Sequence, residues 1–345
     1  HVTGGINAAA CARRRSDGVG LRLIFHENSC QGMICRSDKG IVLNEPSIVA
    51  YNKKTEEVVA VGKKAYDMLG KTPEYIVAEK PLKDGVISNH KLTELMIKEF
   101  IKQVCGHFVI KPRIVICIPS VTTDVERRAV VETALAAGAR KVYLIEEPIA
   151  AALGAGIDIL EPKGNLLVDI GGGTTDVAVI SLNGIVLSQS LKVAGNSFDE
   201  EIIRFFLNRY KLSIGQRMAE NVKKQVGCVY HPDPSNTCTV KGRNLLTVYP
   251  QAIQVDEATL CEVLRPLADK IVEKIKQVLE QTPPELVGDI YTSGIHMTGG
   301  GSLIRGLSDL IRDEIKIPVE VVEDPIGAVS RGTGLSFKYL ESFQE

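Results

Sequence analysis

The sequence predicts an α/β protein made of two similar lobes with a ligand held between them. Apolar segments of strand length alternate with segments of helical periodicity through most of the 345 residues, which is typical of layered α/β domains. A glycine-rich turn joins two apolar segments between residues 166 and 180. The tetrapeptide Gly-Ile-Val-Leu occurs at residues 40–43 and again at residues 184–187. Duplication of one lobe is the simplest explanation of this repeat, and coincidence of a short apolar string is the alternative.

Each copy of the tetrapeptide is the third strand of a predicted meander. The strands are expected at residues 21–25, 33–35 and 40–43 in the first half, and at residues 166–170, 177–180 and 184–187 in the second half. The two meanders are expected to occupy corresponding places in the two lobes.

The remaining elements follow from boundary signals. The apolar segment at residues 114–118 ends at Pro119, and residues 121–124 supply capping side chains for a helix that Gly138 closes. We expect a strand at 114–118, a helix at 126–137, a strand at 142–145 and a helix from Pro148 to about residue 154. A long helix is expected at 260–279. A strand at 295–298 should then precede a helix that includes Leu303. Residues 231–244, rich in Pro, Asn, Thr and Gly, are expected to form a surface excursion.

Composition excludes several classes of protein. The chain is 44% hydrophobic and 24% charged with a net charge of −1, so it has no general attraction to nucleic acid. Tryptophan is absent and aromatic residues make up 5%, so no base-stacking surface and no nucleic-acid partner are predicted. No run of 18 or more apolar residues occurs, so no membrane span is expected. The eight cysteines lack metal-site spacing and are expected to be reduced core residues of a cytoplasmic protein.

The most informative segment is residues 166–176, Leu-Leu-Val-Asp-Ile-Gly-Gly-Gly-Thr-Thr-Asp. Its apolar strand ends at Asp169, and the three glycines let backbone N–H groups approach a ligand without a Cβ in the way. Successive N–H groups of this kind bind anions such as phosphate. Asp169 can hold a hydrated magnesium ion and Thr174 can orient a water molecule. The alternative is a glycine-rich hairpin without a ligand.

The corresponding turn of the first meander differs in chemistry. Residues 26–32 read His-Glu-Asn-Ser-Cys-Gln-Gly, with one glycine and no aspartate. This difference weakens the case for nucleotide hydrolysis.

Three segments together resemble the ATPase superfamily of actin and the heat-shock chaperones: residues 142–156, the Asp169 turn, and residues 297–306. Within this superfamily the chain is similar to the MreB/Mbl family of bacterial actins. Supporting segments are residues 40–47, 81–86, 111–119, 281–286 and 324–332. The resemblance runs from about residue 34 to the C-terminus. A chaperone ATPase would be expected to continue into a long peptide-binding domain, for which a chain ending at Glu345 leaves no room.

The resemblance implies a two-lobed actin-like (ribonuclease H-like) ATPase fold, in which each lobe is a mixed sheet flanked by helices. Lobe I would comprise residues 1–153, with a small subdomain at about 42–74. Lobe II would comprise residues 154–322, with a small subdomain at about 191–253. Residues 323–345 would return to lobe I.

The resemblance also implies ATP and Mg²⁺ as cofactors. The metal and the β- and γ-phosphates would be held by Asp169 and by the turn residues Gly171, Gly172, Gly173, Thr174 and Thr175. Glu147 would position the attacking water together with Thr174. The alternative for Glu147 is a capping carboxylate at a helix start, where the helix dipole favours it.

The adenosine would lie against a second glycine turn and a helix of lobe II. Gly299, Gly300 and Gly301 would let it approach the backbone; a tight strand-to-helix turn is the alternative. Glu220 and Lys223, one helical turn apart, would reach the nucleoside, or would pair with each other as a surface salt bridge.

The implied function is a filament of the chain itself, at the inner face of the cell membrane, that organises membrane-bound cell-wall synthesis proteins and rod shape. Phe108, Val109 and Ile110 would insert into the membrane surface; alternatively they belong to the strand that follows. ATP hydrolysis would control filament lifetime. Two other functions stay open: a monomeric actin-fold chaperone or reactivase ATPase, and a nucleotide-deficient passive filament subunit.

The first 32 residues match nothing in the family, and the chain begins with His1 rather than Met. Either this segment is a mistranslated or truncated part of the gene, or the protein is a divergent paralogue with an impaired first phosphate loop. The strand meander persists on both accounts. We therefore predict a folded chain with weak or absent ATP hydrolysis.

Overall fold

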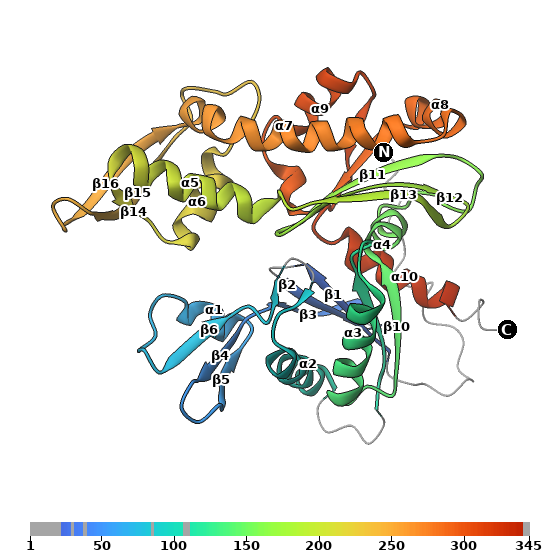
Figure 1. Cartoon of the computed structure of the whole chain (residues 1–345), viewed down its shortest axis with the longest axis horizontal. Coiled ribbons are helices and arrows are strands. Elements are labelled where there is room, and N and C mark those ends of the chain that lie inside the picture. Colours follow the sequence, from blue (N-terminus) through green and yellow to red (C-terminus); the bar gives the residue numbers. More distant parts are fainter. Residues whose placement is uncertain (1–21, 29–30, 37–39, 84–85, 106–110, 341–345) are drawn as a thin grey trace, which may run out of the picture.

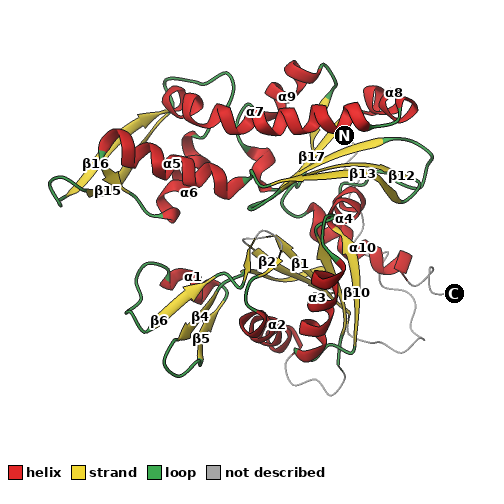
Figure 2. Ribbon diagram, in the orientation of Figure 1, coloured by secondary structure: helices red, strands yellow, loops and turns green. Residues whose placement is uncertain are grey.

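The chain folds into two lobes, one above the other in Figure 1, joined on one side by helices. The structure is a computed structural model, and it describes residues 22–28, 31–36, 40–83, 86–105 and 111–340. Each lobe is built on a mixed five-stranded sheet, and each carries a smaller sheet at the same end of the molecule (Figure 2). The sequence-based prediction of an actin-like α/β fold with helix-flanked mixed sheets is confirmed by the solved structures described below.

The sheet of lobe I has the strand order β10-β9-β1-β2-β3. Its strands are β1 (Arg22–Asn28), β2 (Gln31–Arg36), β3 (Gly40–Pro46), β9 (Arg113–Ile118) and β10 (Lys141–Glu146). Strands β1, β2 and β3 form an antiparallel meander, and β1, β9 and β10 run parallel.

The sheet of lobe II repeats this topology with the order β13-β12-β11-β17-β18. Its strands are β11 (Asn165–Ile170), β12 (Thr175–Ser181), β13 (Gly184–Leu191), β17 (Ile295–Thr298) and β18 (Val319–Val321). Again three strands form an antiparallel meander and its first strand continues into a parallel set. The two Gly-Ile-Val-Leu tetrapeptides begin β3 and β13, so the predicted repeat corresponds to equivalent strands.

Strand β9 is buried on both faces, which explains its continuous apolar sequence. Ile114, Ile116 and Ile118 pack on α2 (His90–Cys105) and α3 (Asp124–Ala136). Val115 and Cys117 point to the opposite face, toward α4 (Glu147–Gly154) and α10 (Ala328–Leu340). Because successive side chains of a strand alternate between faces, one strand serves two helical layers.

Helix α4 lies between the two sheets. Three consecutive alanines, Ala150, Ala151 and Ala152, are fully buried in a core that also contains Val115 of lobe I and Leu167 of lobe II. Three adjacent small side chains on a helix point in different directions, so α4 contacts both sheets and α10 at once. The core that joins the lobes is therefore built around this helix.

Helices α4 and α10 cross at a pair of glycines. A Cβ on Gly154 would lie 1.7 Å from the carbonyl oxygen of Ala328, and a Cβ on Gly332 would lie 1.6 Å from that of Ala150. Backbone therefore touches backbone at this crossing. The capping box of α3, with Thr123 and Glu126, and the proline at the start of α4 also agree with the sequence signals.

The smaller sheets have cores of their own. In lobe I, β5-β4-β6 comprises β4 (Val49–Asn52), β5 (Val58–Val61) and β6 (Ile76–Glu79), and α1 (Lys63–Met68) packs on it; β7 (Leu82–Lys83) and β8 (Val86–Ile87) pair nearby. In lobe II, β14 (Leu212–Ser213), β15 (Thr237–Asn244) and β16 (Pro250–Asp256) form a sheet beside α5 (Gly195–Tyr210) and α6 (Gln216–Val226). Lobe II also contains α7 (Glu257–Gln281), α8 (Pro284–Ser293), a 3₁₀ helix (Gly300–Leu303) and α9 (Leu307–Ile315).

Two sequence-based predictions need correction. The helix after the second glycine turn begins at Leu307 rather than including Leu303. The 3₁₀ helix ends at Leu303, and Gly306, whose φ of 78° is not helical, is the N-cap of α9. Residues 231–244 are not wholly a surface excursion, since residues 237–244 form β15. Cys238 and Val240 are buried there while Thr239 is exposed, so a period of two was present beneath a loop-like composition.

Two sequence-based predictions concern the membrane. Among the described residues, no helix is long and apolar enough to cross a membrane. The candidate membrane loop, Phe108, Val109 and Ile110, lies outside the described residues, so its role stays a prediction.

We expect Gly154→Ala and Gly332→Ala each to lower the free energy of unfolding by about 1–3 kcal/mol or more, because the added methyl group meets backbone atoms that cannot rotate away. Gly288→Ala, in the interior of α8, is the matched control. No atom lies within 4 Å of its added Cβ, so it should raise stability by about 0.5–1 kcal/mol. Urea unfolding of the three variants measures the difference. Equal stability of all three would contradict the close helix crossing.

Candidate functional site

Two glycine turns meet at the carboxyl ends of β11 and β17. These strands are parallel, and Asp169 stands opposite Thr298 in their register. The first turn, residues 171–174, leads from β11 into β12; the second, residues 299–301, follows β17. Side chains and turns at the carboxyl ends of neighbouring parallel strands share one edge of the sheet, which is where open α/β sheets bind ligands. The sequence-predicted glycine segments are therefore brought together.

The first turn rests on the N-terminus of α5. The N–H of Gly195 donates to the carbonyl of Gly171 at 3.1 Å, and the N–H of Asn196 donates to that of Gly172 at 2.7 Å. A Cβ on Gly195 would lie 3.3 Å from the Gly171 oxygen, a tight contact that the neighbouring turn would have to shift to accommodate. The positive end of a 16-residue helix thus lies beside the turn and favours an anion.

The second turn packs directly on the end of β11. Gly299 has a φ of 81°, and a Cβ there would lie 2.3 Å from the carbonyl oxygen of Ile170 and 2.5 Å from Oδ1 of Asp169. The N–H of Gly299 donates to the carbonyl of Pro325 at 2.9 Å. Both the backbone conformation and the contact require glycine at this position.

Two aspartates face each other across the first turn. Asp169 and Asp176 are directly opposite in the antiparallel register of β11 and β12, and both are buried. Thr298 donates to Oδ1 of Asp169 and Thr174 donates to Oδ2 of Asp176, both at 3.1 Å. Oδ1 of Asp176 has no hydrogen-bond partner among the described residues.

Burial and like charge make this pair unusually basic. Burial, together with the negative charge of Asp176, raises the pKa of Asp169 from 3.8 to about 7. Burial also raises the pKa of Asp176, although hydrogen bonds from Ser190 and Thr174 oppose the shift. Two carboxylates that cannot both ionise freely form a site that gains from a nearby cation.

Glu147 approaches the same place from lobe I. It is the first residue of α4, directly after β10, and it is buried. Burial raises the pKa of the Cys117 thiol well above its usual range, and the charges of Glu147 and Asp169 contribute to the same shift. The thiol is therefore close to carboxylates from both lobes, and α4 carries Glu147 to the boundary between them.

Glu220 and Lys223 lie on α6 but bind different partners. The ammonium of Lys223 is 2.8 Å from Oδ1 of Asp199 and donates to the carbonyl of Gly195 at 2.8 Å, next to the first glycine turn. Glu220 accepts from Lys224 at 2.6 Å through Oε1 and from the Tyr66 hydroxyl at 3.3 Å through Oε2. Lys223 thus faces the N-terminus of α5 beside the first glycine turn, whereas Glu220 lies toward lobe I.

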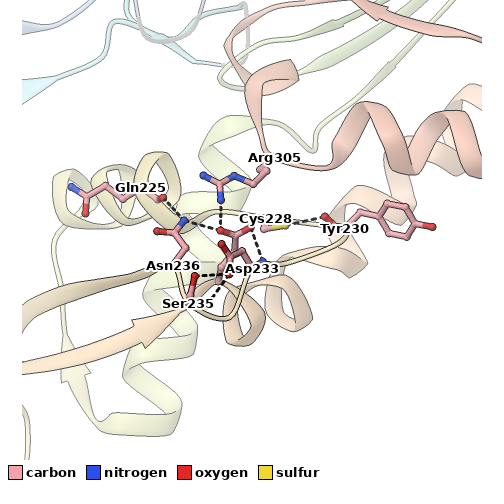
Figure 3. Close-up of polar contacts among 8 residues, drawn as sticks. Gln225, Cys228, Tyr230, Asp233, Ser235, Asn236 and Arg305 are labelled. Atoms are coloured by element: carbon pink, nitrogen blue, oxygen red, sulfur yellow. Dashed lines mark hydrogen bonds and ion pairs between the residues drawn. The ribbon is translucent and has the colours of Figure 1, made fainter.

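A polar network around a buried carboxylate lies next to the segment that follows the second glycine turn. Glu257, a carboxylate with no exposed surface, forms an ion pair with Arg305 and accepts from Nδ2 of Asn236 at 2.7 Å. Figure 3 shows Arg305 and Asn236 converging from different segments, with Asp233 and Ser235 beside them. The network ties the chain after α6 and the start of α7 to Arg305, so it fixes the segment that follows the second glycine turn.

The sequence matches a known protein family over most of its length. The family model described as MreB/Mbl protein matches residues 28–345. The chain belongs to the MreB/Mbl family.

Individual relatives extend the likeness over most of the chain. The cell shape-determining protein Mbl of Bacillus subtilis (strain 168) is 48% identical over 305 residues, covering 88% of this chain and 91% of that protein. The crystal structure of MreB5 of Spiroplasma citri bound to AMPPNP is 36% identical, with a TM-score of 0.91 over 95% of this chain and 98% of that one. A MamK double helical filament has a TM-score of 0.78 over 92% of this chain and 99% of its own at 23% identity, which shows a shared fold.

Four residues of the site were missed by sequence reasoning. Asp176 had a signal, because a four-residue turn between paired strands places it opposite Asp169. Gly195, Asp199 and Thr298 come from distant segments and had none, since their contacts with the turn are made only by the folded chain.

We expect Asp169→Asn to stabilise this protein without nucleotide at pH 8, and to stabilise it less at pH 5.5. The pKa of Asp169 is about 7 in the folded chain and 3.8 ordinarily. As pH falls below 7 the folded carboxyl therefore gains a proton that the unfolded chain does not bind until pH 4, so wild-type stability rises. Asparagine is neutral throughout. Between pH 8 and 5.5 the difference in unfolding free energy should shrink by on the order of 1–2 kcal/mol.

Thermal unfolding in metal-free buffer measures this difference. Asp233→Asn is the control. Hydrogen bonds from Ser235 lower the pKa of this exposed carboxyl, so it is ionised throughout this range and its effect should not change with pH. A pH-independent effect of Asp169→Asn would contradict the raised pKa.

Proposed function

We propose that this chain is an ATP-binding bacterial actin homologue that assembles into membrane-associated filaments and takes part in cell-shape determination. One observation supports it most: two glycine turns and a helix N-terminus surround a buried pair of aspartates at the boundary between two lobes. The family relatives are cell shape-determining proteins, and one close structural relative was solved with AMPPNP.

The phosphates would bind at the first turn. The backbone of Gly171, Gly172 and Gly173 and the side chains of Thr174 and Thr175 would surround them, and α5 adds the positive end of its dipole. In the structure the N–H of Gly171 donates to the carbonyl of Thr174 at 2.9 Å, and the hydroxyls of Thr174 and Thr175 donate to Asp176 and to the carbonyl of Val193, so phosphate contacts would replace these internal bonds. Lys223, which already binds the carbonyl of Gly195, places a positive charge beside this turn. The site therefore offers both directional donors and charge to a polyphosphate.

The aspartate pair fits a divalent cation. Among the described residues Oδ1 of Asp176 accepts no hydrogen bond, and the pKa of Asp169 is raised, so each carboxylate gains from a positive charge. Within the described ranges no group of three or more His, Cys, Asp or Glu side chains could hold a metal, so phosphate and water oxygens would complete the coordination, as Mg²⁺ prefers. Bound Mg²⁺ would neutralise phosphate charge during hydrolysis.

Glu147 would orient the attacking water with Thr174. Its carboxylate lies at the N-terminus of α4, where the helix dipole favours the ionised form, and it approaches from the lobe opposite Asp169. Phosphoryl transfer to water needs positioning more than covalent chemistry, so a fixed carboxylate of this kind suffices. The nucleoside would lie near Gly299, Gly300 and Gly301, with Glu220 on its other side.

The sequence of residues 26–32, between the first two strands of lobe I, favours slow hydrolysis. Strands β1 and β2 pair up to Asn28 and Gln31, which leaves two residues between them. Strands β11 and β12 pair up to Ile170 and Thr175, which leaves four. Residues 26–32 contain one glycine and no aspartate, whereas residues 169–175 contain three glycines and Asp169. This difference keeps a nucleotide-deficient passive subunit as the second candidate.

The cellular role follows from the family. We infer that the chain polymerises with itself at the inner face of the membrane, with Phe108, Val109 and Ile110 as a contact, and works with membrane-bound cell-wall synthesis proteins. One such loop would bind weakly, and a filament would multiply its contacts.

We expect the purified chain to bind Mg-ATP in a calorimetric titration and to sediment with ATP but not without nucleotide. Glu147→Gln should leave the dissociation constant within about threefold and lower residual phosphate release by about tenfold or more, because it removes the water-positioning charge but no phosphate contact. ATP binding without ATP-dependent sedimentation would favour the monomeric ATPase. Co-sedimentation with a related filament in the absence of nucleotide binding would favour the passive subunit.

A further inference from the structure

Tyr66 reaches from lobe I to lobe II. It lies on α1 in the small subdomain of lobe I, and its hydroxyl is 3.3 Å from Oε2 of Glu220 on α6, 154 residues away in the sequence. Its ring faces the guanidinium of Arg217, 5.8 Å from the ring centroid. Helices α1 and α6 lie on facing sides of the two lobes, at the end remote from α4 and α10 (Figure 1). The contact is therefore far from the covalent connection between the lobes.

The charges on both sides suit a directed hydrogen bond. Burial and the nearby Glu220 raise the pKa of Tyr66, so its phenol keeps the proton that it donates. Burial opposes ionisation of Glu220, but the hydrogen bond from Lys224 and nearby lysine charges outweigh it and lower the pKa of Glu220. The acceptor is thus a carboxylate that Lys224 holds through its other oxygen, and Tyr66 fixes the remaining one.

Helix α6 connects this contact to the phosphate turn. One turn of α6 separates Glu220 from Lys223, whose ammonium binds Asp199 and the carbonyl of Gly195. Gly195 in turn donates to Gly171 of the first glycine turn. A shift of α6 relative to lobe I would therefore move both Glu220 and the support of the phosphate turn.

We propose that Tyr66 is a positioning residue for the bound nucleoside triphosphate: from lobe I it fixes Glu220 and holds α6 against α1, so that nucleotide leaves only after this contact opens. The proposal rests on the proposed function, in which Glu220 lies beside the nucleoside. Tyr66 itself need not touch the ligand. Its loss should speed nucleotide release more than it slows binding, because the contact stabilises the closed arrangement of the lobes.

Nucleotide release from the full chain tests this role. A fluorescent N-methylanthraniloyl ATP is bound with Mg²⁺ at a protein concentration too low for filament assembly. It is then displaced with an excess of unlabelled ATP. Tyr66→Phe removes the hydroxyl but keeps the ring over Arg217, and it should raise the release rate about three- to tenfold. Tyr66→Ala also removes the ring and should raise it further. Tyr75→Phe, at an exposed tyrosine that faces Lys54 within the same subdomain, is the control and should release at the wild-type rate.

A double-mutant cycle separates positioning from general loosening. In a Glu220→Ala background, Tyr66→Phe should change the release rate less than twofold, because residue 220 then has no side-chain acceptor for the Tyr66 hydroxyl. The melting temperature of the nucleotide-free Tyr66→Phe variant should stay within about 2 °C of wild type.

The outcomes distinguish the two proposals. Wild-type binding with an unchanged release rate in Tyr66→Phe would overturn the role of Tyr66 and leave the proposed function standing. Equal effects of Tyr66→Phe with and without Glu220→Ala would also overturn it. Failure of the wild type to bind the labelled ATP would overturn the proposed function, and the role of Tyr66 with it.

Discussion

The packing of α4 between the two sheets is the constraint on which the rest of the structure depends. Its buried alanines contact β9 of lobe I and β11 of lobe II, and Gly154 and Gly332 bring α10 into backbone contact with it. Larger side chains would push the sheets apart, because protein interiors are close-packed and yield little. The same helix begins with Glu147, so the packing that joins the lobes also sets where that carboxylate lies.

The buried carboxylates connect stability to ligand binding. Asp169 and Asp176 face each other with few compensating charges, and burial raises the pKa of each. Such an arrangement is unfavourable for the empty protein at neutral pH and becomes favourable when a cation neutralises it. Strain of this electrostatic kind is expected at a site whose role is to bind a charged ligand, since polar side chains serving only the fold would be paired.

The two small subdomains form the far side of the proposed nucleotide site. The ion pair of Lys223 and Asp199 holds α6 against α5, beside the first glycine turn. The Glu257 network supports the segment after the second glycine turn. Tyr66 adds a contact from the opposite lobe. Because the lobes are also joined at α4 and α10, contacts at both ends would define how far they can separate.

The sequence by itself determined the elements and the two glycine turns. Alternating apolar segments predicted the repeated meander, and the Pro148 helix and the turn at 171–173 followed from local signals that act within a few residues. The same local reasoning failed where a distant segment decides the outcome: the backbone of Tyr230 lies against Gly306 and breaks the helix expected from Leu303, and pairing with β16 makes a strand of residues 237–244.

Only the tertiary structure decided which charged groups share a site. The partners of Lys223, Glu220 and Asp169 come from α5, α1 and β17. Gly195 is 28 residues from Lys223, Tyr66 is 154 residues from Glu220, and Thr298 is 129 residues from Asp169. No local pattern encodes such separations, because they result from how two sheets and the helix between them pack together. The sequence thus specified the two glycine turns, while packing determined what surrounds them.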